Sequence, residues 1–122
     1  MRLQESGEMY LESIYVLSQN GGHVRSIDIS EYMGYSKPSV SRAVSLLKTG
    51  GYIVMDKDNF ICLTESGLEI AQKIYERHTV LTSMLMRMGV SEATASEDAC
   101  RMEHAISDAT FEAIQKHMQQ YF

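Results

Sequence analysis

Glycines divide the first half of the chain into three short helical segments, and this division limits the fold more than any other feature of the sequence. Asn20-Gly21-Gly22 ends the first segment, Gly34 ends the second, and Gly50-Gly51 ends the third. Apolar residues recur at helical spacing in the first and third segments. The helices are expected over residues 5–19, 27–33 and 37–49.

Capping residues support the second and third of these helices. Ser26 is expected to cap the second helix, with Asp28 in its first turn, where a negative charge favours the helix dipole. Ser36 is expected to cap the third helix. Pro38 follows in the first turn, where its missing N–H costs little.

Two short strand-like runs follow the third helix directly. They occupy residues 52–55 and 60–63, and Asp56-Lys57-Asp58-Asn59 forms a four-residue turn between them. The sequence therefore predicts a β-hairpin at this point. Three short helices followed by a hairpin is the order of a winged helix-turn-helix, which is a DNA-reading unit.

The charge of the same region favours contact with phosphate. The whole chain has a formal net charge of -5, which by itself argues against a nucleic-acid partner. Between Tyr32 and Met55, however, there is no acid, and cations and hydroxyl groups are frequent. They are Lys37, Arg42, Lys48, Ser36, Ser39, Ser41, Ser45 and Thr49. A solvated basic helix face is the alternative, but the winged-helix order favours DNA binding.

The second half of the chain is predicted to be helical. Thr64 is expected to cap a long helix that runs to about Met88 and carries one inward apolar stripe. The stripe consists of Leu68, Ala71, Ile74, Tyr75, His78, Leu81 and Leu85. A further helix is expected over residues 92–105 with Ser91 as its N-cap, and a last one begins at Ser107. The fold class is therefore mainly α.

The last helix carries apolar residues at spacings of 3, 4 and 3, and little of the same chain remains to cover them. These residues are Phe111, Ile114, Met118 and Tyr121. We expect them to form a dimer interface between the second halves of two chains. Core packing within one chain is the alternative.

The composition excludes several classes of protein. It is 44% hydrophobic and 22% charged, which is typical of a globular chain, and no apolar run reaches the ~18–20 residues that span a bilayer. The N-terminus lacks the apolar core of a secretory signal, so Cys62 and Cys100 are interpreted as cytosolic thiols. No catalytic motif such as HExxH or a phosphate-binding glycine loop is present. We expect a cytoplasmic protein with no membrane partner, no small organic substrate and no enzyme activity.

Three of the predicted helices each carry groups that could bind a metal ion. Cys100, Glu103 and His104 lie at i, i+3 and i+4 of one helix and therefore project from one face. Met9 and Glu12 are spaced in the same way on the first helix, and His78 lies on the long helix. Each group alone has a common structural explanation as a core cysteine, a core histidine or a core methionine. A winged-helix regulator that binds no metal, or that senses oxidation through Cys100 or Cys62, therefore remains an alternative.

Five stretches, taken together and in order, resemble the diphtheria-toxin-repressor / manganese-transport-regulator family of metal-dependent transcriptional repressors. They are residues 8–15, 36–42, 63–67, 77–78 and 98–108. The resemblance implies a homodimer that binds double-stranded operator DNA and controls genes of metal homeostasis. It implies a winged-helix DNA-binding domain at residues 1–63 and a helical metal-binding and dimerisation domain at residues 64–122. The SH3-like third domain of longer members is expected to be absent.

The resemblance also implies a ligand set of mixed type. Met9, Cys100, Glu103 and His104 match the primary site of the iron-type members. Glu12 and His78 match further ligands of the binuclear site in the manganese-type members. The chain departs from the iron-type ancillary site, because Thr82 stands where an acid is expected and Ser96 where a histidine is expected.

The softness of these ligands indicates which metal is bound. A thioether and a thiolate favour softer ions over Mn(II), so Fe(II) is expected first and Mn(II) second. Zn(II), Co(II) and Ni(II) are expected to bind in vitro, because affinity follows the Irving–Williams order. A metal held jointly by the ligand helices would fix the angle between the two domains. It would thereby set the spacing of two recognition helices on half-sites about one DNA turn apart.

The third helix is expected to read DNA. Lys37 and Arg42 sit early on it, where side chains reach the major groove. By family position, Ser36, Pro38 and Arg42 face base edges. Ser39 and Ser41 are expected to contact phosphates, as is Lys57 in the hairpin turn.

Overall fold

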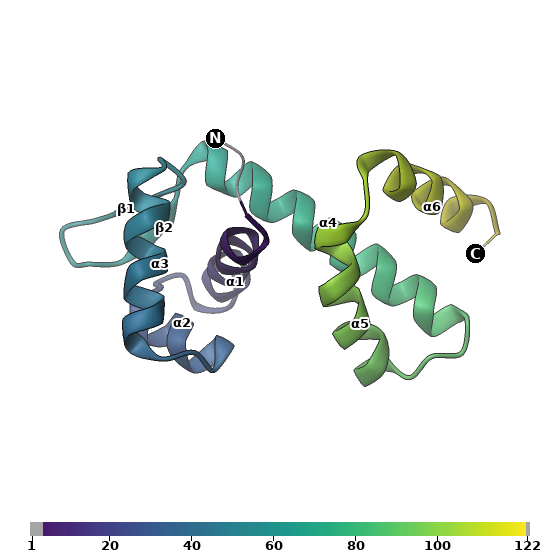
Figure 1. Cartoon of the computed structure of the whole chain (residues 1–122), viewed down its shortest axis with the longest axis horizontal. Coiled ribbons are helices and arrows are strands. Elements are labelled where there is room, and N and C mark those ends of the chain that lie inside the picture. The colour runs from purple at the N-terminus through teal and green to yellow at the C-terminus, as the bar shows by residue number, and fades with distance from the viewer. Residues whose placement is uncertain (1–3, 122) are drawn as a thin grey trace. The chain divides into compact units, whose positions relative to one another are not determined.

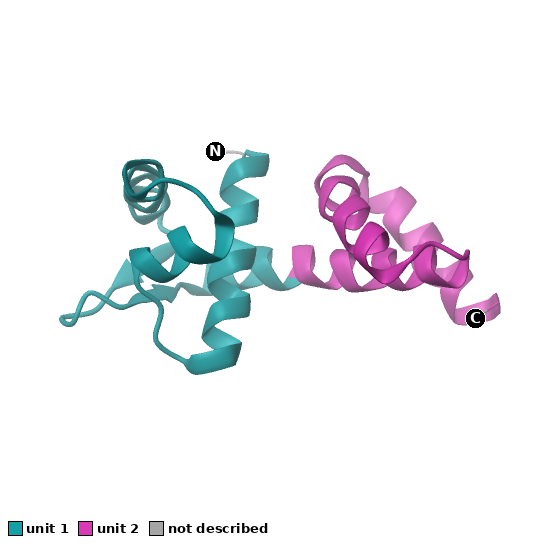
Figure 2. Ribbon diagram, turned by 90° about the horizontal axis from the view of Figure 1, so that it is seen from below, with its two compact units in different colours: residues 1–72 teal, residues 73–122 magenta. Residues whose placement is uncertain are grey.

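The computed structural model describes residues 4–121 and has six helices and a two-stranded sheet within them (Figure 1). The elements are α1 (Glu5–Gly21), α2 (Ser26–Met33), α3 (Lys37–Thr49), β1 (Ile53–Met55), β2 (Ile61–Leu63), α4 (Glu65–Arg87), α5 (Glu92–Ala105) and α6 (Asp108–Tyr121). This order confirms the expected fold class, a winged helix-turn-helix followed by a helical domain. The chain forms two compact units, which divide within α4 between Gln72 and Lys73 (Figure 2).

The core of the first unit lies between α1, α2, α3 and the hairpin. Val40, Val44 and Leu47 on α3 are buried, as their 4 and 3 spacing predicts. They share one core with Leu11 of α1 and Ile29 of α2, both of which have no exposed surface. Burial of one face of α3 leaves its opposite face in solvent.

The helix caps follow the sequence with one correction. The Ser36 hydroxyl accepts a hydrogen bond from the Ser39 N–H at 3.3 Å and caps α3, as expected. The N-cap of α2 is Arg25, not Ser26, which is the first residue of the helix. The reason is Asp28, whose carboxylate accepts the Arg25 N–H at 2.9 Å and so permits the helix to begin one residue earlier.

The hairpin pairs Ile53 with Leu63 and Met55 with Ile61 in antiparallel register, so each strand starts one residue later than expected. The Asp56 carboxylate accepts the N–H groups of Asp58 and Phe60, at 2.9 and 3.0 Å, which closes the predicted turn. Together with the hydrogen bond from the Asp56 N–H to the Phe60 carbonyl at 3.0 Å, they turn the chain directly after Met55.

The start of α4 packs closely on this hairpin. The Thr64 hydroxyl accepts the Gly67 N–H at 3.2 Å, as expected for a cap, and donates to the Gly51 carbonyl at 2.7 Å. A Cβ on Gly67 would lie 2.0 Å from the carbonyl oxygen of Tyr52. Only glycine therefore permits this approach of α4 to the chain before β1.

The second unit contains the rest of α4 with α5 and α6. Leu81 of α4 and two alanines of α5, Ala95 and Ala99, have no exposed surface. Two residues of the apolar stripe predicted for α4 are exposed and contradict the prediction, Leu68 at 38% and Tyr75 at 43%. Arg77, which the stripe did not include, is only 5% exposed. The packing of α5 and α6 covers the flank of α4 that carries Arg77 instead of the one that carries Tyr75. In the described part of the chain, no helix has the length and apolar character to cross a bilayer.

Candidate metal centre and DNA-contacting face

Four of the expected metal ligands come together between α4 and α5. His78 Nδ1 lies 2.9 Å from Oε2 of Glu103 and 3.8 Å from Sγ of Cys100. The other carboxylate oxygen of Glu103, Oε1, lies 3.3 Å from Nε2 of His104. One donor atom each of His78, Cys100 and Glu103 lies within 4.8 Å of the other two. Such a spacing fits ligands that share one metal ion.

Burial makes this cluster unusual for charged groups. Glu103 has no exposed surface, and the side chain of His104 is 1% exposed. The His78 side chain is 21% exposed, and Cys100 is exposed at the edge of the cluster. A carboxylate rarely leaves water without a compensating partner. The donor set of a carboxylate, two imidazoles and a thiol is one that binds divalent transition metals.

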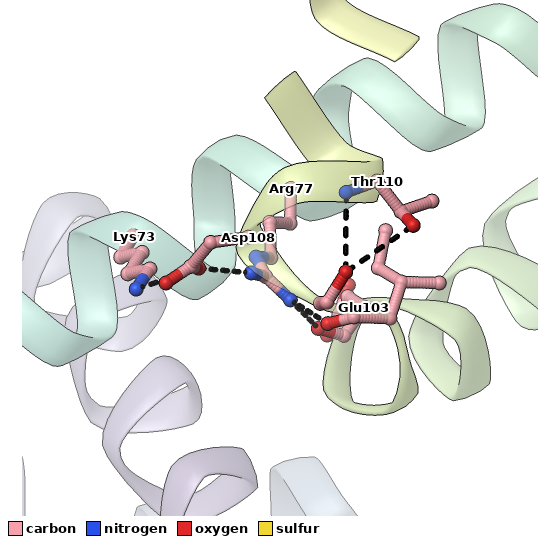
Figure 3. A network of polar contacts seen from close by, with 7 residues as sticks. Lys73, Arg77, Glu103, Asp108 and Thr110 are labelled. Carbon is pink, nitrogen blue, oxygen red and sulfur yellow. Dashed lines mark hydrogen bonds and ion pairs between the residues drawn. The ribbon is translucent and has the colours of Figure 1, made fainter. Parts of the chain in front are cut away.

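Arg77 belongs to the matching stretch at residues 77–78, but the sequence motifs predict no role for it. It precedes His78 on α4, and its guanidinium donates to the carbonyl of Glu103 at 3.0 Å and to the carbonyl of Ile106 at 2.7 Å. It also pairs with Asp108 at the start of α6, and Figure 3 shows this network. The sequence signal that could have pointed to Arg77 is a basic residue at a position on the buried face of an amphipathic helix.

Asp108 has a second basic partner. Its carboxylate lies 2.9 Å from the ammonium of Lys73, and that hydrogen bond, with the charges of Lys73 and Arg77, holds the pKa of Asp108 below its usual value. Asp108 therefore stays ionised under ordinary conditions and keeps its attraction for Arg77.

Two further expected ligands belong to the first unit, and the two departures from the family pattern belong to the second. Met9 and Glu12 are half-buried residues of α1 in the first unit. In the second unit, Ser96 Oγ lies 3.4 Å from Nε2 of His78. The Thr82 hydroxyl is buried and has no hydrogen-bond partner within residues 4–121. A hydroxyl group is a poorer metal ligand than the acid or the histidine expected at these two positions.

The residues expected to contact DNA share the solvent face of α3 and the hairpin turn. Ser36, Lys37, Pro38, Ser41, Arg42 and Lys57 are exposed, and Ser39 is half-buried. A surface hollow of about 380 Å³ is lined by Ser26, Ile27, Lys37 and Ser41, at the N-terminal ends of α2 and α3. This face is free of acidic side chains from Tyr32 to Met55.

Two further basic groups lie beside the hairpin. The Arg25 guanidinium sits 4.5 Å from the centre of the Phe60 ring, and the His23 ring lies 4.4 Å from it. The sequence motifs did not connect these residues, because the stacking depends on the position of Phe60 at the end of the turn. The Arg25 guanidinium of this stack adds positive charge to the same unit as α3.

The apolar stripe of α6 divides into an inner and an outer part. Phe111 is buried, and the Arg77 guanidinium lies 5.4 Å from its ring centre. Ile114 and Met118 are half-buried, and Tyr121 is 69% exposed. Phe111 thus packs within its own unit, while the later residues of the stripe retain surface.

Comparisons with known proteins cover nearly the whole chain. A family model described as the N-terminal DNA-binding domain of iron-dependent repressors matches residues 2–60. A second, described as the metal-binding and dimerisation domain of iron-dependent repressors, matches residues 64–121. The two matches are consecutive and in the same order as the two parts of the fold.

Individual relatives agree with these models. An HTH-type transcriptional regulator of Methanocaldococcus jannaschii is 31% identical over 121 residues, covering 98% of this chain and 97% of the relative. The transcriptional regulator MntR of Escherichia coli O157:H7 is 34% identical over 112 residues, covering 92% of this chain and 72% of MntR. The solved structure of the manganese regulator SloR superposes with a TM-score of 0.84 at 29% identity. That match covers 98% of this chain and 55% of SloR, so the chain spans about half the length of that structure.

Proposed function

The chain belongs to the iron-dependent repressor family of metal-dependent transcriptional regulators, and we propose that it represses its target genes when a divalent metal ion is bound. Members of this family are DNA-binding regulators, not enzymes. We propose that it acts in the cytoplasm as a homodimer on double-stranded operator DNA of metal-homeostasis genes. Residues 1–63 would bind DNA, and residues 64–122 would bind metal and dimerise.

The burial of Glu103 is the observation that carries the proposal. Its completely buried carboxylate lies between the imidazoles of His78 and His104, at 2.9 and 3.3 Å, with Cys100 beside His78. A buried carboxylate needs protons or a cation to balance its charge. A divalent metal ion would supply that charge and would cross-link α4 to α5 through His78 and Glu103.

The proposed metal is Fe(II), with Mn(II) as the second candidate. The Cys100 thiol supports Fe(II), because sulfur ligands favour softer ions. The names of the relatives MntR and SloR, the second of which is called a manganese regulator, support Mn(II). Zn(II), Co(II) and Ni(II) would bind in vitro. The assignment of Met9 and Glu12 as further ligands rests on their i, i+3 spacing on α1 and on the family resemblance.

The proposed DNA contacts follow the exposure of α3. Ser36, Pro38 and Arg42 would face base edges, and Lys37 would enter the major groove beside them. Ser39 and Ser41 would contact phosphates, and so would Lys57 from the hairpin turn. For dimerisation we propose the outer part of the α6 stripe, Ile114, Met118 and Tyr121, together with Phe111 beneath it.

An anaerobic titration tests the proposed function. A DNA duplex is first selected from a random library by the protein in the presence of Mn(II), and its binding is then measured by fluorescence anisotropy against added Fe(II) or Mn(II). We expect either ion to tighten binding by at least about tenfold, which corresponds to about 1.4 kcal/mol of coupling. Glu103→Gln should remove this response.

Glu97→Gln is the matched control, because Glu97 lies on the same helix and its side chain is 74% exposed. It should leave the metal response unchanged. Equal responses of the two variants would mean that the buried carboxylate does not belong to the metal centre. Binding of the same duplex without any metal would contradict metal dependence itself.

A thiol sensor is the second candidate function, since Cys100 is exposed and its sulfur lies 3.8 Å from an imidazole nitrogen. In that case mild peroxide would change DNA affinity in metal-free protein, and Cys100→Ser would abolish the change. The metal-dependent function predicts instead that peroxide has no effect on DNA affinity when metal is absent.

A further inference from the structure

Arg77 is a buried cation at the point where the three helices of the second unit meet. It is 5% exposed and lies on α4 directly before His78. Burying a guanidinium is unfavourable unless acceptors replace its water. The Nη1 and Nη2 groups of Arg77 find them in two backbone carbonyls and one carboxylate, and Figure 3 shows this network.

The acceptors of Arg77 define where α5 ends and α6 begins. Glu103 O belongs to the last turn of α5, Ile106 O follows that helix, and Asp108 is the first residue of α6. The last carbonyls of a helix have no partner within the helix, and a cation is favourable at that end. Arg77 therefore holds the backbone that leads from one helix into the next.

Glu103 is held from both of its ends by neighbouring residues of α4. Arg77 donates to its carbonyl at 3.0 Å, while Nδ1 of His78 lies 2.9 Å from its carboxylate. The position of the carboxylate thus depends on a backbone contact as well as on the side-chain pair. A donor group that binds metal must keep its geometry within a few tenths of an ångström, and neighbouring hydrogen bonds supply that precision.

We propose that Arg77 is a positioning residue of the metal centre, which fixes Glu103 for metal binding and links it through Asp108 to the start of α6. The inference rests on the proposed metal-binding function of the same cluster. Lys73, whose ammonium lies 2.9 Å from Asp108, supports the link from the solvent side. Because α6 carries the proposed dimer surface, the same contacts would connect metal occupancy to that helix.

The test measures Co(II) binding to the full-length protein by its visible absorption, since the intensity and position of the Co(II) bands report the coordination geometry. Arg77→Lys keeps the charge but cannot reach two carbonyls and a carboxylate at once. We expect it to weaken Co(II) binding by about 10–100-fold and to change the spectrum. Arg101→Lys is the matched control, because Arg101 is exposed on α5 and pairs with Glu97 and Asp98 on the same helix; it should leave both readouts unchanged.

Asp108→Asn provides a second variant that does not threaten the fold, since the Asp108 side chain is 66% exposed. It should weaken Co(II) binding less than Arg77→Lys and change the spectrum in the same direction. Circular dichroism at the titration temperature verifies that each variant is folded. A purely structural role for Arg77 would lower the melting temperature and leave the spectrum of the folded protein as in the wild type.

The possible outcomes distinguish a failure of the role proposed for Arg77 from a failure of the proposed metal-binding function. If the wild type shows no Co(II) bands, the assignment of the metal centre is wrong, and the role proposed for Arg77 is overturned as well. If the wild type binds Co(II) and folded Arg77→Lys matches it in affinity and spectrum, only the role of Arg77 is overturned. If Arg77→Lys does not fold, an unchanged affinity and spectrum in Asp108→Asn overturn that role.

Discussion

The Nδ1 atom of His78 lies 2.9 Å from a carboxylate oxygen of Glu103, a residue with no exposed surface. This pair joins the long helix α4 to α5 and forms the centre of the proposed metal site. Its partners on either side, Cys100 and His104, lie on the same helix as Glu103. His78, Cys100, Glu103 and His104 therefore all lie within one compact unit.

Loss of His104 should remove a ligand from the metal centre. We expect His104→Ala to weaken Mn(II) binding, measured by calorimetry, by at least about 100-fold, which exceeds the usual effect of losing a residue that only supports a ligand. His117→Ala is the control, since His117 is an exposed histidine of α6. Equal affinities of His104→Ala and the wild type would remove His104 from the ligand set.

The sulfur ligands should set the preference between metals. Replacing them in the double variant Met9→Asp, Cys100→Glu makes the donor set harder, so DNA binding should respond more strongly to Mn(II) relative to Fe(II). Anaerobic titrations with each ion give the ratio of the two responses. Cys62→Ser, which changes the exposed cysteine of β2, should leave the ratio unchanged. A ratio that stays at the wild-type value in the double variant would contradict the softness argument.

The proposed base contact of Arg42 and phosphate contact of Lys57 predict different losses. Arg42→Ala should cost about 1–3 kcal/mol on the selected duplex and much less on scrambled DNA, because it reads a base. Lys57→Ala should weaken both DNAs alike and lower the slope of affinity against salt by about one. Salt titrations of both variants on both duplexes give these values. Equal losses of Arg42→Ala on the two DNAs would show that Arg42 does not read bases.

Gly67 should tolerate no side chain. A Cβ there would lie 2.0 Å from the Tyr52 carbonyl oxygen, so Gly67→Ala should lower the free energy of unfolding by about 1–3 kcal/mol. Gly21→Ala is the matched control, because no atom lies within 4 Å of the added Cβ and Gly21 is helical. That variant should be neutral or more stable by up to about 1 kcal/mol. Urea unfolding measures both, and similar values for the two would contradict the close approach of α4 to the hairpin.

The Asp108 carboxylate should make the free energy of unfolding depend on pH in the acidic range. The hydrogen bond from Lys73, and then the charges of Lys73 and Arg77, lower its pKa in the folded protein. The stabilisation is therefore complete above the unfolded-state pKa of about 3.9 and is lost as the pH falls through the lower, folded-state value. Asp108→Asn should reduce the free energy of unfolding at pH 7, and its difference from the wild type should shrink below about pH 4.

Urea unfolding at pH 7 and at pH 3 measures this difference. Because the carboxylate is largely exposed, added salt should reduce the difference at pH 7 as well. A difference that is the same at both pH values would assign the effect to hydrogen bonding and not to charge.

The sequence by itself determined the local features of this protein. Glycine breaks, the Ser36 cap and the Asp56 turn depend on residues within a few positions of one another, so they could be predicted from the chain directly. The same holds for Cys100, Glu103 and His104, since the spacing along one helix is enough to put them on one face. The winged-helix order followed from these local signals.

Only the tertiary structure decided which of these faces meet. The sequence did not show that Nδ1 of His78 faces Glu103, nor that Arg77 and not Tyr75 is buried on α4. An apolar stripe of 3.6-residue period leaves both of its flanks available, and the helices that pack on it select one. The environment of Glu103 has the same origin. His78 of α4 lies against its carboxylate and Arg77 against its carbonyl, and both contacts join residues far apart in the chain.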